Sequence, residues 1–145
     1  MLIAIELKSI MTEHKKAAKN RKRDLEAHHE HVHNYDPKAI AGGVFVVNAA
    51  ERFRSPTRRP GDITTHRDPL DKVEHCLSEL RNVSVRGGPT GTGLDAKAGL
   101  VVDMDNMDLE STSYLVNTPA PRVGDPMHYD AFIQRLCAEY TSRHG

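Results

Sequence analysis

The chain lacks the signatures of several large classes of protein. It has only two cysteines, Cys76 and Cys137, and their separation indicates neither a disulfide framework nor a cysteine-based zinc site. No apolar run approaches the length of about 20 residues that crosses a bilayer. The first residues also lack the basic segment and cleavage site of a signal peptide. We therefore expect a soluble, cytoplasmic protein that does not contact membranes.

The chain also lacks net charge, because 20 basic and 20 acidic residues cancel. A uniformly basic protein is therefore excluded, whereas a local basic patch is not. The charge is in fact uneven: six of the residues from 15 to 23 are basic, residues 52–67 are basic as well, and acidic residues gather at 103–110. Any nucleic-acid-binding surface would therefore be a local one, at these basic segments.

Apolar runs and helical patterns alternate along the 145 residues, which predicts a single α/β domain spanning 1–145, with a small mixed sheet flanked by helices. The spacing of Met11, Ala18, Leu25 and Val32 by seven residues predicts one apolar stripe on the first helix. Strands are expected at 1–8, 44–48, 99–103 and 114–116, and helices at 12–33, from 68 and from 125, with Thr12, Asp68 and Asp125 as N-caps. The proline-rich residues 52–60 are expected to form a loop without regular structure.

The first strand carries an acid and a lysine side by side. Leu2 to Ile5 form an apolar run typical of a buried strand, and Glu6 and Lys8 follow at its end. Because side chains alternate along a strand, Glu6 and Lys8 share a face. The same acid-x-lysine spacing also occurs at Glu13–Lys15, Asp36–Lys38 and Asp95–Lys97. Among these four pairs, only Glu6–Lys8 follows an apolar strand and precedes a basic helix. The simplest alternative is that Glu6 and Lys8 form a strand-end ion pair that contributes little to stability.

Residues 3–9, the basic helix and residues 43–48 together resemble the second half of a restriction-endonuclease-like, PD-(D/E)xK nuclease core. The resemblance implies a DNA endonuclease that hydrolyses phosphodiester bonds with Mg²⁺ or Mn²⁺. Glu6 would be a metal ligand and catalytic residue, and Lys8 the catalytic lysine. A homodimer is compatible with this class.

One part of the family pattern is missing. The family places a metal-binding Asp on a strand before the acid and lysine, and no residue precedes Met1 here. The expected core is therefore N-terminally incomplete, and the chain is either a fragment of a longer nuclease or a form that has lost catalysis. Asp103 or Asp105, after a later strand, could replace the missing Asp only through an unusual strand order.

The basic helix offers contacts to DNA phosphates. Lys16 and Asn20 lie one helical turn apart and would face one groove. The expected DNA-binding residues are Lys15, Lys16, Asn20 and Arg23, with Arg58 and Arg59 in the later basic segment. Such contacts give salt-dependent affinity without base specificity, and a solvated helix face is the alternative. The second functional hypothesis is accordingly a non-catalytic nucleic-acid-binding or interaction module.

A histidine run supplies a third hypothesis. Residues 29–33 match the His-Glu-x-x-His pattern of zinc proteases, in which His29 and His33 would bind zinc and Glu30 would act as base. The run is expected at the frayed end of a polar helix, so the default interpretation is a pH-sensitive polar face. The glycine-rich residues 87–93 lack the Lys-Ser/Thr of a phosphate loop and are expected to form a flexible loop.

Overall fold

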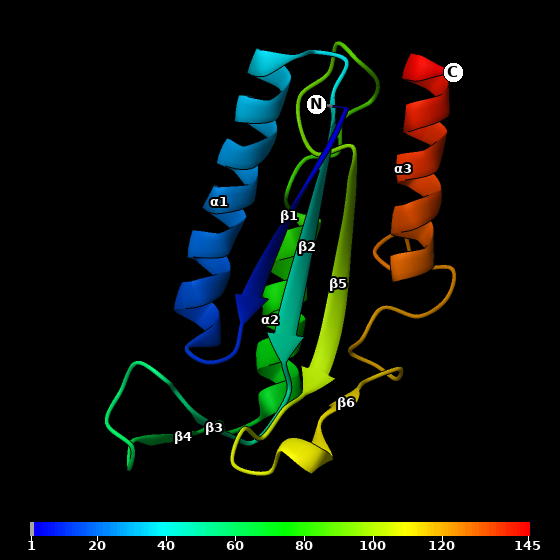
Figure 1. The fold of residues 1–145 in the computed structure, drawn as a ribbon. Coiled ribbons are helices and arrows are strands. Elements are labelled where there is room, and N and C mark those ends of the chain that lie inside the picture. The colour runs from blue at the N-terminus through cyan, green and yellow to red at the C-terminus, as the bar shows by residue number, and fades with distance from the viewer. Residues whose placement is uncertain (1) are drawn as a thin grey trace.

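A four-stranded mixed sheet forms the centre of the computed structural model, which describes residues 2–145 apart from the side chain of Leu109. Its strand order is β1-β2-β5-β6 (Figure 1). The first three strands are parallel and β6 is antiparallel to β5. The strands are β1 (Ile3–Ile10), β2 (Ile40–Asn48), β5 (Ala96–Asp103) and β6 (Ser113–Tyr114). The expected α/β class, with a small mixed sheet flanked by helices, is confirmed.

The helices cover both faces of this sheet. They are α1 (His14–Tyr35), α2 (Pro69–Arg81) and α3 (Tyr129–His144). Two neighbouring glycines of β2 show the layering, since a Cβ added at Gly43 would meet Leu25 of α1 and one at Gly42 would meet Phe132 of α3. Successive strand residues point to opposite faces, so α1 and α3 lie on opposite sides of the sheet. Figure 1 shows α2 beside α1, with α3 alone across the sheet.

Two hydrophobic clusters fill these layers. The apolar stripe is confirmed for Ala18, Leu25 and Val32, which are all buried in the larger cluster together with α2, whereas Met11 precedes α1 and is only partly buried. On the other face Phe132 and Leu136 of α3 pack over β2 and β5. None of the helices in residues 2–145 combines the length and the apolarity needed to span a bilayer.

The first strand differs from the expected buried strand. β1 lies at the edge of the sheet and pairs only with β2 among the described residues. Its burial alternates, and the side chains of Ile3, Ile5 and Leu7 are 41%, 51% and 60% exposed. The expectation was wrong because an apolar run reports hydrophobicity but not the number of neighbouring strands, and α3 packs over β2 and β5 instead.

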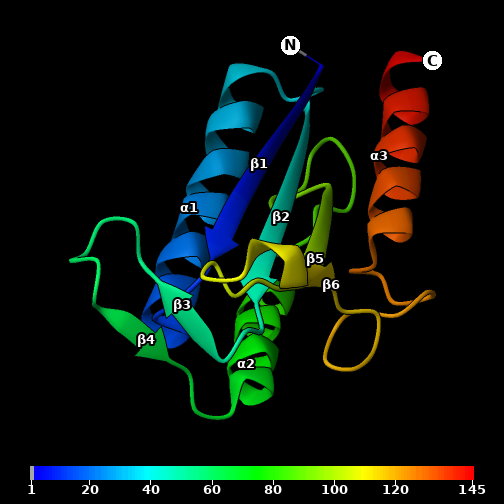
Figure 2. The same cartoon turned by 60° about the horizontal axis from the view of Figure 1, so that its bottom comes forward.

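The basic segment after β2 is not a plain loop. Residues 52–60 were expected to be irregular, but β3 (Arg52–Arg54) and β4 (Ile63–Thr65) form a small antiparallel pair. Figure 2 shows this pair standing away from the main sheet, beyond the start of α1. The prolines lie between the two short strands, where no ladder hydrogen bond is required of them. A 3₁₀ turn, η1 (Leu109–Ser111), precedes β6.

The helix starts also differ from those expected. Glu13, not Thr12, precedes α1, with a left-handed φ of 50° and no side-chain cap. The Thr12 hydroxyl instead lies 3.1 Å from His66 Nε2. Asp68 does precede α2, but with a φ of 52° and no capping hydrogen bond. The last helix begins after His128, whose side chain accepts a hydrogen bond from the N–H of Asp130, and not after Asp125. Local sequence thus located the helices and the N-cap position of α2, but not the residues that precede α1 and α3.

Candidate functional site

Glu6 and Lys8 point to the same face of β1, as the strand periodicity predicts. Lys8 Nζ lies 2.7 Å from Glu6 Oε1, and both side chains are about one-quarter exposed. The hydrogen bond with Glu6 raises the pKa of Lys8, although burial alone would lower it. The pair lies inside the strand, because β1 continues to Ile10. Glu6 and Lys8 therefore form an ion pair on the surface of an edge strand, not at the end of a buried one.

Helix α1 adds three side chains to this pair. Asp24 Oδ2 lies 3.4 Å from Lys8 Nζ and accepts a hydrogen bond of 3.1 Å from Arg21. His28 Nδ1 lies 3.7 Å from Glu6 Oε2, and its Nε2 is 3.3 Å from the carbonyl oxygen of Ala4. We call Glu6, Lys8, Arg21, Asp24 and His28 the edge cluster.

Sequence reasoning did not single out the α1 members of the edge cluster. A signal was present, because Arg21, Asp24 and His28 are three and four residues apart, beside the apolar stripe. A polar row next to the stripe of a helix lies at the border of the sheet. This row could have been matched to Glu6 and Lys8.

The edge cluster does not by itself fit a magnesium ion. Mg²⁺ requires an octahedral shell of oxygens, usually including one or two carboxylates. The ammonium of Lys8 already contacts both Glu6 and Asp24. Within residues 2–145, no group of three or more His, Cys, Asp or Glu side chains is arranged to hold a metal. Glu6 is thus one candidate ligand, and a magnesium site would need further acidic groups.

Asp103 and Asp105 do not supply them. Strand registry places Glu6 level with Gly43 of β2, which is level with Lys97 of β5. Asp103 therefore lies six residues further along the sheet and two strands away, or about 20 Å along the strand direction alone. Asp105 instead binds Arg52, at 2.6 Å. Replacement of the missing Asp by either residue is excluded within one chain.

The expected DNA-binding residues lie on the outer side of α1. Lys15, Lys16, Asn20 and Arg23 are all exposed. Residues four apart on a helix are neighbours, so Lys16, Asn20 and Asp24 form a row that leads from the solvent face to the edge cluster. Lys15 and Lys16 line a shallow depression of about 290 Å³ together with Lys72 of α2, whereas Asn20 and Arg23 do not line it. The basic residues thus follow one helix but do not all face one groove.

The second basic segment is partly neutralised. Arg58 contacts Glu13 at 3.0 Å and Asp62 at 3.8 Å. Arg59 is exposed in the same turn. Arg58 therefore adds little free positive charge to the basic side of α1.

The histidine run is packed, not frayed. The side chain of His29 is buried and its ring centroid lies 6.2 Å from that of His33. His33 Nε2 lies 3.1 Å from Asp95 Oδ2, while Glu30 faces solvent. Burial lowers the pKa of both His29 and His33. The pair is therefore a structural part of the helix interface, and its geometry does not favour a zinc site.

Asp95 is the centre of a second charged cluster that the sequence did not reveal. Its side chain is fully buried and accepts a 2.8 Å hydrogen bond from the N–H of Ala41. Arg143 of α3 donates to Asp95 and also to Glu139, and His33 of α1 contacts Asp95 as well. We call Asp95, His33, Arg143 and Glu139 the buried cluster. Burial alone would raise the pKa of Asp95, but the hydrogen bonds from Arg143 and Ala41 outweigh it and hold the pKa below its usual value.

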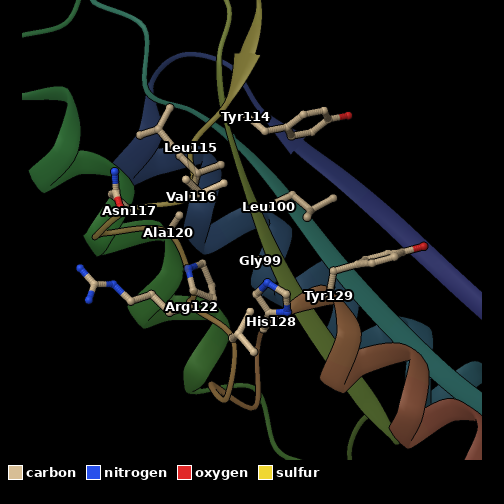
Figure 3. A pocket seen from close by; sticks show the side chains of 13 residues that line it. Gly99, Leu100, Tyr114, Leu115, Val116, Asn117, Ala120, Arg122, His128 and Tyr129 are labelled. Atoms are coloured by element: carbon tan, nitrogen blue, oxygen red, sulfur yellow. The ribbon is translucent and has the colours of Figure 1, made fainter.

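A cavity of about 570 Å³ lies beside β5, between the segment around β6 and the start of α3. Figure 3 shows Tyr114 and Tyr129 on one side of this cavity and Arg122 on the other, with His128 at the start of α3 between them. Strand β2 separates β5, which lines this cavity, from β1, which carries Glu6 and Lys8. Its lining contains no acidic side chain, so it offers no carboxylate for metal or acid–base chemistry.

In comparisons with known proteins, no protein-family model, no curated protein and no solved structure matches this chain. The function is therefore argued from the sites themselves.

Proposed function

We propose that this chain is a nuclease-like domain that binds DNA along the outer side of α1, with Glu6 and Lys8 at the phosphodiester-hydrolysing site. The observation that carries the proposal is the charged pair on one face of β1, 2.7 Å apart and joined to the basic helix by the row of Lys16, Asn20 and Asp24. The proposal requires that this α/β fold be a restriction-endonuclease-like core.

The chemistry assigned to this pair is electrostatic. Attack of water on a phosphodiester adds negative charge to the phosphorus oxygens, and a fixed ammonium stabilises that charge. Lys8 would supply the ammonium, since its contact with Glu6 keeps it protonated and oriented. Hydrolysis that depends on Mg²⁺ or Mn²⁺ would also need acidic ligands beyond those that these residues bring together.

The helix would provide affinity. Lys16, Asn20 and Arg23 are exposed and belong to no ion pair among the described residues. Cationic and amide side chains on an open helix face bind phosphate oxygens without reading the base sequence. The proposal therefore includes salt-dependent binding to DNA of any sequence.

Nicking of supercoiled plasmid in Mg²⁺ or Mn²⁺ tests the catalytic part. We expect Lys8→Ala and Glu6→Gln to abolish nicking. Lys38→Ala is the matched control, because Asp36 and Lys38 have the same acid-x-lysine spacing on an exposed turn. Nicking that survives both site substitutions would overturn the assignment of Glu6 and Lys8.

A second candidate is a nucleic-acid-binding module without catalysis. It is favoured by one observation, namely that Lys8 contacts both carboxylates of the edge cluster and so leaves neither free. Plasmid binding that weakens with salt, with no nicking in either metal, would support this module over the nuclease.

A further inference from the structure

The free edge of β1 is built to accept another strand. The N–H of Ile40 in β2 donates to the carbonyl oxygen of Leu2. In a parallel pair the hydrogen-bonding residues alternate, so the even-numbered residues of β1 bond to β2. The backbone N–H and C=O groups of Ile3, Ile5 and Leu7 therefore point away from β2, to the side where no described strand lies.

The side chains of this edge are unusually apolar for an exposed strand. Ile3 and Ile5 line a groove of about 440 Å³ with Ile133, Leu136 and Tyr140 of α3, and Leu7 lies beyond it, 60% exposed. Natural proteins normally protect such edges with proline, bulges or charges of one sign, because a long apolar edge pairs with other chains. The charges present here are one acid and one lysine, which do not repel an identical strand.

Charge complementarity selects one way for two copies to pair. In an antiparallel pair centred on Leu7, residue 6 of one copy lies opposite residue 8 of the other. Glu6 then faces Lys8 of the other copy, twice in each dimer. Leu7 meets its own counterpart as a hydrogen-bonded pair, as its outward backbone groups require. Centring on residue 6 or 8 would instead place like charges opposite each other, which is unfavourable.

We propose that β1 is a self-association surface, on which two copies of this chain join edge to edge in an antiparallel pair centred on Leu7 and form one continuous sheet. This interface does not depend on the nuclease proposal, because it rests on the backbone edge and on side-chain complementarity alone. It places the two edge clusters side by side across a two-fold axis.

The test is the oligomeric state of the full chain, measured by sedimentation velocity from about 1 to 100 µM, a range that brackets a micromolar Kd. We expect a dimer that Leu7→Asp converts to a monomer. Val123→Asp is the matched control, since Val123 is also an exposed apolar residue but lies outside β1, and it should leave the dimer intact. Circular dichroism and thermal unfolding verify that each variant is folded.

Charge reversal tests the register itself. Glu6→Lys alone and Lys8→Glu alone each place like charges opposite each other twice, and each should raise the dimer Kd by at least about tenfold. The double variant Glu6→Lys/Lys8→Glu should restore association. A chain that stays monomeric at 100 µM would overturn the proposal, and so would a dimer that Leu7→Asp leaves unchanged. In either case the partner of the β1 edge would be a strand of another protein. Failure of the double variant to restore a folded dimer would overturn this register.

Discussion

The acid-x-lysine pattern occurs within β1, at Glu6–Lys8, and again at the start of β5, where Asp95 immediately precedes the strand and Lys97 lies in it, and the two instances have opposite roles. Glu6 and Lys8 contact each other at the exposed edge. Asp95 is buried against Arg143 and His33, and Lys97 donates to the carbonyl oxygens of residues 80, 81 and 83 at the end of α2, at 2.6–3.0 Å. An acid and a lysine at this spacing are therefore accessible to a ligand at the edge of the sheet, whereas in the interior they bind groups of the protein itself.

The two sites differ in whether solvent can replace a lost partner. At the edge, solvent can replace either partner, so the pair contributes little to stability and remains free to act. In the interior, removal of one partner leaves a charge or a set of carbonyl groups without compensation. Substitutions at matched positions of the two patterns should separate the two roles.

The largest effect is expected at Asp95. Asp95→Ala leaves the buried guanidinium of Arg143 with only Glu139 as a carboxylate partner, and the N–H of Ala41 without its acceptor. We expect a loss of about 3–5 kcal/mol in the free energy of unfolding. Urea denaturation measures it, with Glu6→Ala as the control at the edge, which should cost less than about 1 kcal/mol. Equal losses in the two variants would contradict the distinction.

Lys8 should show the reverse behaviour. Lys8→Met should reduce any plasmid nicking by at least about 100-fold, as expected for loss of a fixed donor to a developing charge. The free energy of unfolding should change by less than about 1 kcal/mol, because the side chain is partly exposed and only its ion pairs are lost. Nicking assays and urea denaturation on the same preparation provide both values. A fully unfolded Lys8→Met variant would assign Lys8 to the fold.

As the pH falls, the contacts of the buried titratable side chains should weaken before those of the edge cluster. Burial lowers the pKa values of His14, His29 and His33, so the folded chain binds fewer protons than the unfolded chain. The free energy of unfolding should therefore fall as the pH drops below the usual histidine pKa of about 6.5. Asp95, whose pKa is held low, adds a further loss below about pH 4.

Urea denaturation between pH 8 and pH 3 measures this dependence. His29→Gln should make the free energy of unfolding less dependent on pH near 6, while His31→Gln, on the exposed side of the same helix, serves as the control. A stability that rises from pH 7 to pH 5 would contradict the burial argument.

The smallest effect is expected on the solvent face of α1. Lys16→Ala and Arg23→Ala should each weaken DNA binding modestly and reduce the slope of log K against log salt by about one. Fluorescence anisotropy at several salt concentrations measures both quantities. Lys38→Ala, outside the helix, is expected to leave the slope unchanged. An unchanged slope in all three variants would show that α1 does not contact phosphates.

Local pattern was sufficient for part of this structure. The spacing of Ala18, Leu25 and Val32 predicted the buried stripe of α1, and the two-residue spacing of Glu6 and Lys8 predicted their shared face. Both follow from the periodicity of a single element, which a sequence carries directly. The exposed positions of Lys16 and Arg23 follow in the same way.

Which strands and side chains lie next to each other was decided only by the tertiary structure. The run from Leu2 to Ile5 is the same whether one strand or two lie beside it, so its edge position could not be read from it. Asp24 and His28 join the edge cluster because α1 crosses back over β1. Asp95 becomes a buried centre because Arg143 arrives from 48 residues away. The sequence by itself determined which faces are apolar or charged, and the fold decided which of those faces meet, because contact depends on residues that lie far apart along the chain.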